Sequence, residues 1–134
     1  MIKQVTVFLE NTKGRLAALT RALADDNVNM EALTIAETSD YGLVRIICDK
    51  PVEAVAALDG AGFRAITTEV IAVVVPNRPG GLADLLEKLD ALDLNIEYGY
   101  CFSAKAGEAV DVLKVSDPTR AVKAIEDAGF ELAK

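Results

Sequence analysis

The apolar residues in the first half of the chain change from the two-residue period of a strand to the wider period of a helix. Residues 3–10 alternate and are rich in β-branched side chains, which predicts a strand. Helical spacing follows at Leu16, Leu19, Leu23 and Val28. It predicts a helix over about 14–26 that ends near Asn27, where a left-handed residue can close it. The remaining predicted elements are strands over 29–38, 43–49 and 63–68 and a helix over 52–59 opened by Pro51.

The second half of the chain repeats this order of elements. It predicts strands over 69–75, 94–103 and 108–115, helices over 80–92 and 118–128, and a short last strand from Phe130. Each half follows the order β-α-β-β-α-β, the ferredoxin-like pattern in which two helices cover one face of a four-stranded antiparallel sheet. We therefore expect an α+β fold of two such modules in tandem, residues 1–68 and 69–134, with residues 67–69 as the pivot.

The two halves also correspond residue by residue. At an offset of 66 positions, Asn11, Gly14, Leu16 and Asn29 return as Asn77, Gly80, Leu82 and Asn95. Val44 keeps this register with Val110, and a one-residue insertion then carries Ala61-Gly62-Phe63 to Ala128-Gly129-Phe130. Apolar matches alone would indicate a duplicated fold. The matched asparagines, with a glycine three residues after the first of each pair, indicate that a binding site was duplicated too.

The composition narrows the possible partners. With 134 residues, each module is near the size at which a lone hydrophobic core is marginal, so packing on another module or chain is expected. The net charge is −7 and Lys and Arg do not cluster, so we do not expect nucleic acid as a partner. No apolar run approaches about 18 residues, and no signal peptide is recognisable. These features predict a soluble cytoplasmic protein without a membrane partner.

Histidine is absent from the sequence, which removes the commonest catalytic base and metal ligand. None of the usual motifs for a nucleophilic serine, a phosphate-binding loop or a dinucleotide site is present. We therefore expect a protein that is not an enzyme and has no catalytic residues, no metal site and no cofactor. Cys48 and Cys101 do not correspond in the repeat, and both lie in apolar strand segments. They are interpreted as small core residues of a reducing compartment.

Each repeat carries the same short loop between its first strand and first helix. In the second module the chain passes from Asn77 through Gly80 into a helix, whose unpaired N–H groups favour a carboxylate. An asparagine amide accepts a hydrogen bond from an ammonium group and donates to a carboxylate without adding charge. The loop therefore suits a small zwitterion. The start of the second strand is not adjacent to the loop within one module, so Asn95 is expected to meet the loop of a neighbouring module.

A purely structural interpretation competes with this one. Asn11 and Asn77 could be N-caps, the glycines ordinary turn residues, and Asn29 and Asn95 simple strand-entry residues. The recurrence of all these residues in both modules favours binding, because Ser, Thr or Asp cap a helix equally well.

The segment 74–82, Val-Val-Pro-Asn-Arg-Pro-Gly-Gly-Leu, followed by Leu94-Asn95-Ile96, resembles the ACT domain, a small regulatory amino-acid-binding module of metabolic enzymes. Its Asn-Arg-Pro-Gly form is similar to the serine-sensing ACT domain of phosphoglycerate dehydrogenase. The resemblance implies a βαββαβ fold, modules paired through their sheets, and ligand at the interface between modules. The ligand-binding residues that it implies are Asn11, Thr12, Gly14, Arg15, Leu16, Asn29, Asn77, Arg78, Pro79, Gly80, Gly81, Leu82 and Asn95. In the first module Thr12-Lys13 replaces Arg-Pro, which leaves that loop less rigid.

The resemblance covers essentially the whole chain and implies a stand-alone tandem-ACT protein. We expect a regulatory protein that senses a free amino acid, pairs as a homodimer and serves a metabolic enzyme. The alternative is a protein-interaction subunit of an amino-acid metabolic enzyme that keeps the fold but has vestigial ligand sites. A small enzyme on the same fold is least favoured, because the Arg-containing loop of ferredoxin-like acylphosphatases is not found.

Overall fold

The computed structural model describes residues 1–37 and 40–133, so residue 38, the expected end of the second strand, lies outside the described residues. The chain divides into two compact units, Lys3–Thr68 and Glu69–Lys134 together with Met1–Ile2. We call them the first and second modules. The first module contains β1 (Ile2–Glu10), α1 (Arg15–Asp25), β2 (Met30–Glu37), β3 (Tyr41–Cys48), α2 (Pro51–Gly60) and the beginning of β4 (Arg64–Pro76). The second contains the rest of β4, α3 (Gly81–Asp90), β5 (Ile96–Lys105), β6 (Glu108–Val115), α4 (Pro118–Asp127) and β7 (Glu131–Leu132).

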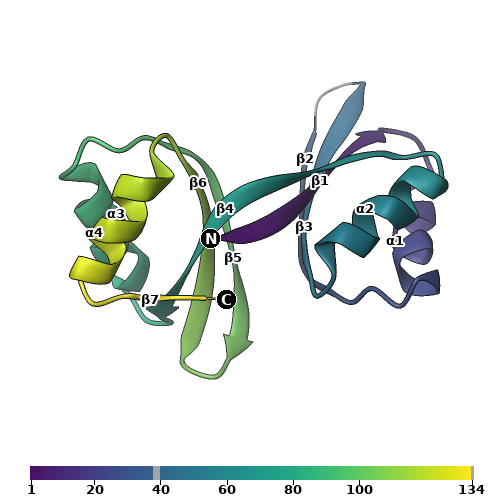
Figure 1. Cartoon of the computed structure of the whole chain (residues 1–134). Coiled ribbons are helices and arrows are strands. Elements are labelled where there is room, and N and C mark those ends of the chain that lie inside the picture. Colours follow the sequence, from purple (N-terminus) through teal and green to yellow (C-terminus); the bar gives the residue numbers. More distant parts are fainter. Residues whose placement is uncertain (38–39, 134) are drawn as a thin grey trace. The chain divides into compact units, whose positions relative to one another are not determined.

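Both modules have the predicted ferredoxin-like topology. The strand order is β4-β1-β3-β2 in the first module and β7-β4-β6-β5 in the second. The pairs β1–β3, β2–β3, β4–β6, β4–β7 and β5–β6 are antiparallel. Each module's two helices lie on one face of its sheet (Figure 1). The expected α+β fold of two tandem βαββαβ modules is confirmed.

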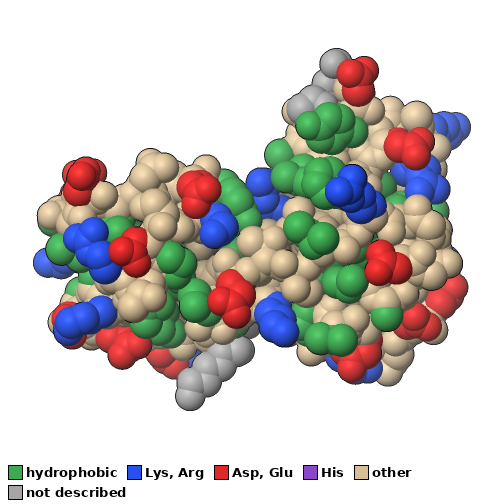
Figure 2. Space-filling view, turned by 45° about the horizontal axis from the view of Figure 1, so that its top comes forward, with side chains coloured by type: hydrophobic (Ala, Val, Ile, Leu, Met, Phe, Trp, Pro, Cys, Tyr) green, Lys and Arg blue, Asp and Glu red, His purple; other side chains and the backbone are tan. Residues whose placement is uncertain are grey.

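Each module has its own aliphatic core between the sheet and the helices. In the first module the core includes the inward positions of β1 and β3, at Val5, Val7, Leu9, Val44 and Ile46, together with helix residues such as Leu19, Leu23 and Leu58. The second core is built in the same way around Ile71, Val73, Val75, Leu85, Leu89, Leu113 and Ile125. On the face shown in Figure 2, basic side chains are scattered among acidic ones rather than gathered into one patch.

The helix ends follow the repeated sequence. Asn27 has a φ of 57° and closes α1, with the N–H of Val28 bonded to the carbonyl O of Leu23 at 3.0 Å. Asp93, with a φ of 56°, occupies the same place after α3. The predicted left-handed residue at Asn27 is therefore confirmed.

The repeated Ala-Gly-Phe segment closes the second helix of each module. Gly62 has a φ of 88°, and the N–H of Phe63 bonds back to the carbonyl O of Leu58 at 2.9 Å. Gly129 and Phe130 repeat this arrangement after α4. The left-handed conformation favours glycine and lets the following phenylalanine turn toward the core.

Two predictions about the repeat were wrong in detail. The strands expected at 63–68 and 69–75 are one continuous strand, β4, without a break at 67–69, because the β-branched run satisfies strand geometry throughout. The insertion also comes earlier than expected. Val7 pairs with Val44, whereas its counterpart Val73 pairs with Asp111, so Val44 corresponds to Asp111 and not to Val110. The extra residue lies near the end of β5, where the register against β6 shifts between Phe102 and Lys105.

Candidate functional site

The loop between β4 and α3 is held by backbone hydrogen bonds. The N–H of Asn77 donates to the carbonyl O of Gly107 at 3.0 Å, and the N–H of Arg78 donates to that of Pro76 at 3.0 Å. The N–H of Gly81 donates to the carbonyl O of Arg78, also at 3.0 Å. The first module makes the corresponding bonds from Asn11, Thr12 and Arg15. The duplication has therefore preserved the conformation of the loop as well as its residues.

Glycine carries each loop into its helix. Gly80 has a φ of 86° and Gly14 a φ of 91°, a conformation that other residues rarely adopt. These glycines are the N-caps of α3 and α1, and neither helix has a side-chain cap hydrogen bond. The alternative in which Asn11 and Asn77 are N-caps is therefore wrong, since the chain continues past them through two further residues before the cap.

The first turn of each helix presents unpaired backbone donors. The N–H groups of Leu82 and Ala83 have no hydrogen-bond acceptor among the described residues, and the same holds for Leu16 and Ala17. The leucine side chains differ, because Leu82 is 43% exposed whereas Leu16 packs against the first core. Free N–H groups and the helix dipole together can hold a carboxylate.

Arg78 is turned toward its own loop and helix. Its Nη1 donates to the carbonyl O of Pro79 at 3.0 Å, and its Nη2 donates to Oδ2 of Asp84 at 3.2 Å. Both partners of this ion pair are about half exposed, so the pair adds little stability. The ion pair places the guanidinium of Arg78 beside Gly80, and a Cβ added at Gly80 would lie 3.5 Å from Nη1 of Arg78. Arg78 would have to leave Asp84 to bind a ligand carboxylate.

The asparagines have fixed backbones and unoccupied side chains. Asn11, Asn29, Asn77 and Asn95 are all exposed, and none of their side-chain amides forms a hydrogen bond to a described residue. The N–H of Asn29 donates to Oδ1 of Asp49 at 2.9 Å, and the N–H of Asp49 returns a bond to the carbonyl O of Asn29 at 3.2 Å. Ser116 holds Asn95 in the same two-way manner, at 3.2 and 3.0 Å. The backbone bonds thus hold these asparagines in place, and their side-chain amides form no hydrogen bond to a described residue.

The two asparagines of a module lie at opposite ends of its sheet. In the first module Asn11 follows the residue paired with Tyr41, at the start of β3, and Asn29 precedes the residue paired with Cys48, at its end. Eight strand residues extend over roughly 25 Å. One small ligand cannot contact both side chains within a single module, as the sequence predicted.

A hollow of about 460 Å³ lies beside Asn95 in the second module. Its other lining residues come from α3, from the connection that follows and from the start of β5, at Leu86, Glu87, Asp90, Leu94 and Ile96. The loop of the same module does not contribute to this lining. Asn95 therefore opens on a space of the size that small ligands occupy.

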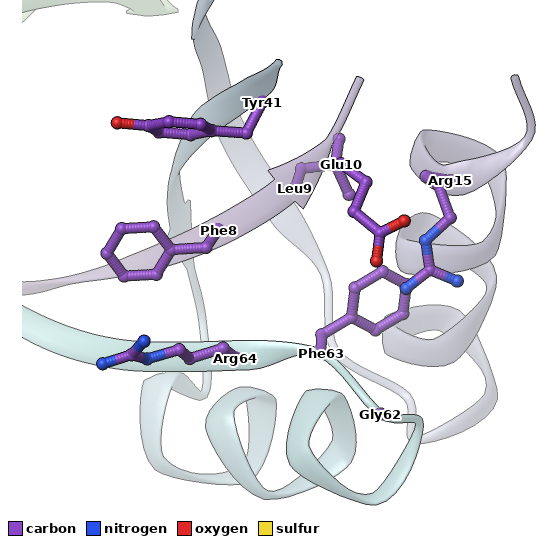
Figure 3. A pocket seen from close by; sticks show the side chains of 8 residues that line it. All are labelled: Phe8, Leu9, Glu10, Arg15, Tyr41, Gly62, Phe63 and Arg64. Atoms are coloured by element: carbon purple, nitrogen blue, oxygen red, sulfur yellow. The ribbon is translucent and has the colours of Figure 1, made fainter. Parts of the chain in front are cut away.

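Arg15 occupies the position of Gly81 in the repeat, and its side chain lines a pocket of about 310 Å³ within the first module (Figure 3). The guanidinium carbon of Arg15 lies 4.3 Å from the ring centroid of Phe63. At this distance the pair makes a cation–π contact. The structure thus separates Arg15 from the other loop residues and directs it toward the C-terminal end of α2.

Sequence reasoning missed Asp111, a buried carboxylate on β6. Asp111 is 4% exposed and shares the helix-facing side of the sheet with its strand partner Val73. Its Oδ2 has no hydrogen-bond partner among the described residues, and burial raises the pKa of the Asp111 carboxyl above its ordinary value. The sequence does contain a sign of this buried acid, because Asp111 occupies an inward position of an alternating strand. The alignment of the repeat paired Val44 with Val110 instead, so Asp111 was not assigned to that position.

Other expectations concern the cysteines, metals and membranes. Cys48 is buried as expected, but Cys101 is exposed, because β5 is an edge strand of its sheet; both thiols are free. Within residues 1–37 and 40–133, no group of three or more His, Cys, Asp or Glu side chains is arranged to hold a metal ion. No helix in this described part of the chain is long and apolar enough to span a membrane.

The comparison with protein families decides the identity of the fold. A family model described as an ACT domain pair matches residues 1–130. The chain belongs to the ACT domain pair family. No curated protein matches the chain in sequence.

Solved structures extend this result. Protein BT0572 from Bacteroides thetaiotaomicron is 37% identical, with a TM-score of 0.93 over 98% of this chain and 90% of that one. The ligand-free regulatory subunit of aspartate kinase from Thermus thermophilus is 17% identical, with a TM-score of 0.70 over 95% and 92% of the two chains. The corresponding subunit from Thermus flavus is 18% identical, with a TM-score of 0.64 over 94% and 91%. The ACT domain pair thus shares its tandem fold with regulatory subunits.

Proposed function

We propose that this ACT domain pair is a regulatory protein without catalytic activity that binds a free amino acid through its asparagine–glycine loops. The observation that carries the proposal is the repeated set of four exposed asparagine amides, which make no hydrogen bonds to described residues although their backbones are fixed. An amide left free at a rigid position can bind a ligand without first breaking an internal bond.

The chemistry of each loop suits the head group of an amino acid. The open N–H groups of Leu82 and Ala83 would bind the carboxylate. The amide of Asn77 would donate to the same carboxylate or accept from the ammonium group. Gly80 keeps side-chain bulk away from the approach to these donors. In the first module Asn11, Thr12, Gly14 and Leu16 would form the corresponding loop.

The separation of the two asparagines within a module implies a second module. We propose that a second copy of the chain supplies it, so that the loop of one copy meets Asn29 or Asn95 of the other. The protein would then act as a homodimer, and ligand binding would strengthen the pairing of the two copies. The hollow beside Asn95 would receive the ligand's side chain.

The regulatory role is supported by fold. Two neighbours are described as regulatory subunits of aspartate kinase, a metabolic enzyme. Their sequence identities to this chain, 17% and 18%, support a shared fold only. An enzyme partner for this chain is therefore part of the proposal. Two free cysteines agree with action in the cytoplasm, where thiols remain reduced.

Calorimetric titration of asparagine variants tests the site. Asn77→Asp and Asn95→Asp remove the NH₂ donor and add a negative charge, and each should weaken amino-acid binding roughly 10- to 100-fold. Asn27→Asp is the matched control, because the second module already has Asp93 at that position with nearly the same φ. Unchanged affinity in both site variants would remove the site assignment.

A protein-interaction subunit with vestigial ligand sites is the rival function. The observation in its favour is the departure of the first module from the loop pattern at Thr12-Lys13. That rival predicts that no amino acid binds at the loops of wild-type protein, whereas the proposed function predicts saturable binding that the asparagine variants weaken.

A further inference from the structure

A hollow recurs at the same place in both modules, where the first strand ends and the last strand begins. In the first module it is formed by Leu9 at the end of β1 and by Gly62 and Phe63 after α2. In the second, Val75, Gly129 and Phe130 take these places, and the hollow measures about 460 Å³ against about 310 Å³ in the first. The duplication has therefore kept a cavity whose lining does not include the asparagines.

The two hollows differ in charge. In the first, Arg15, Arg64 and Glu10 line the pocket. In the second, the positions of Tyr41 and Arg64 are occupied by Glu108 and Glu131. Glu10 is replaced by Pro76, and Arg15 by Gly81. Only the first pocket therefore offers cations, although the whole chain has a net charge of −7.

The first pocket has a polar end and an aromatic end. Figure 3 shows Glu10 and Arg15 directed toward the same end, next to the ring of Phe63. Phe8 and Tyr41 project together at the other end from neighbouring strands, above Arg64. The guanidinium carbon of Arg64 lies 5.2 Å from the ring centroid of Phe8. Phe8 and Tyr41 are 41% and 49% exposed, so a ligand lying against them would bury substantial aromatic surface.

The charged groups at the polar end are available to a ligand. Neither Arg15 nor Glu10 forms an ion pair with a described residue, and Nε of Arg15 is buried without a hydrogen-bond partner among the described residues. A buried donor without a partner is costly, and a ligand that supplies an acceptor removes that cost. A bare carboxylate would be attracted by Arg15 but repelled by Glu10. A head group with both charges satisfies both side chains.

We infer that this pocket is a second binding site, internal to the first module, for an amino acid with an aromatic side chain. Arg15 binds the carboxylate, Glu10 accepts from the ammonium group, and the ring of the ligand lies against Phe8 and Tyr41. The volume of about 310 Å³ is at the lower end of the range for small-molecule sites. The inference stands independently of the asparagine loops, and it predicts one such site per chain.

Titration calorimetry with L-phenylalanine, 3-phenylpropionate and 2-phenylethylamine tests the inference on the full-length chain. L-phenylalanine should bind saturably, and the two analogues, each lacking one charged group, should bind at least roughly tenfold more weakly. Arg15→Gln and Glu10→Gln should each weaken L-phenylalanine binding roughly 10- to 100-fold. Arg21→Gln is the matched control, because Arg21 lies on the same helix with its side chain 74% exposed. Circular dichroism melting of each variant shows whether it is folded.

The inference is overturned if wild-type protein shows no L-phenylalanine binding tighter than about 10 mM, or if Arg15→Gln and Glu10→Gln bind it as well as wild type does. Equal affinity for L-phenylalanine and 3-phenylpropionate overturns the role of Glu10 and with it the ligand class. Asn77→Asp and Asn11→Asp report on the loops rather than on this pocket. Binding that these variants abolish while Arg15→Gln retains it belongs to the loops, which supports the proposed function and overturns this site.

Discussion

Val44 and Asp111 occupy the same position in the two modules, one as a core valine and the other as a buried carboxylate. Each is the strand partner of an equivalent residue, Val7 or Val73. Val44 is 0% exposed and Asp111 is 4% exposed, so both side chains are buried although one is apolar and the other is ionisable. A charge in such a place is destabilising unless it is paired.

Replacing Asp111 with the valine of the first module should stabilise the second module. Asp111→Val should raise the free energy of unfolding at pH 7.5 by about 1–3 kcal/mol, because Oδ2 has no partner among the described residues. Urea denaturation measures the effect. The reciprocal variant, Val44→Asp, should lower stability by at least as much, and a destabilised Asp111→Val protein would contradict the account.

The effect of Asp111 should depend on pH in a defined direction. Because burial raises the folded-state pKa of Asp111, the folded chain binds the carboxyl proton more tightly than the unfolded chain does. The free energy of unfolding therefore falls as the pH rises from the unfolded-state pKa to the folded-state pKa of this group. The difference in stability between Asp111→Asn and wild type should therefore narrow as pH falls toward about 4, the ordinary aspartate pKa. A difference that is constant from pH 3.5 to 8 would show that Asp111 is not desolvated.

Gly81 should not tolerate a side chain. A Cβ at this position would collide with the carbonyl O of Pro76 at the end of β4, so Gly81→Ala should destabilise the protein by about 2–4 kcal/mol. Gly60→Ala is the control, because a Cβ there meets nothing within 4 Å and the residue lies at the end of α2. That variant should be neutral or slightly stabilising. Similar stabilities for the two variants would mean that the loop moves freely away from Gly81.

The two cysteines should differ in reactivity. Cys101 is exposed, whereas Cys48 is buried and burial raises the pKa of its thiol. Iodoacetamide should modify Cys101 in the native protein and leave Cys48 unmodified until the protein is unfolded. Peptide mass spectrometry after timed quenching measures both rates, and denaturant provides the control in which both react. Equal native rates would contradict the burial of Cys48.

The fold was predictable from sequence because local periodicity and the internal repeat agreed with each other. Alternation of β-branched residues identified the strands, and the glycines and asparagines marked the helix ends, as at Asn27 and Gly62. The insertion was misplaced because Val44 and Val110 are identical by residue type, and only strand pairing shows that Val44 corresponds to Asp111. The identity of one valine does not reveal the shift, which changes the face of every following side chain.

The candidate site was predictable in part. The loop, its glycines and the separation of the asparagines followed from the repeat and the topology. The pocket at Arg15 did not, because it depends on where residues distant in sequence meet, such as Phe8 and Phe63. Cys101 was assigned to the core because apolar neighbours do not show which strand of a sheet is at its edge.

A thermal-shift screen with each of the twenty amino acids tests the central claim most directly. It compares wild-type protein with the Asn77→Ala/Asn95→Ala double variant. At about 100 times its dissociation constant, a ligand of the folded state stabilises by about 2.7 kcal/mol, which raises the melting temperature by several degrees. We predict at least one amino acid whose shift is present in wild type and lost in the double variant, with little change in the melting temperature of the unliganded variant. If no amino acid shows a shift that depends on these two asparagines, the protein does not sense amino acids through Asn77 and Asn95, which contradicts the account.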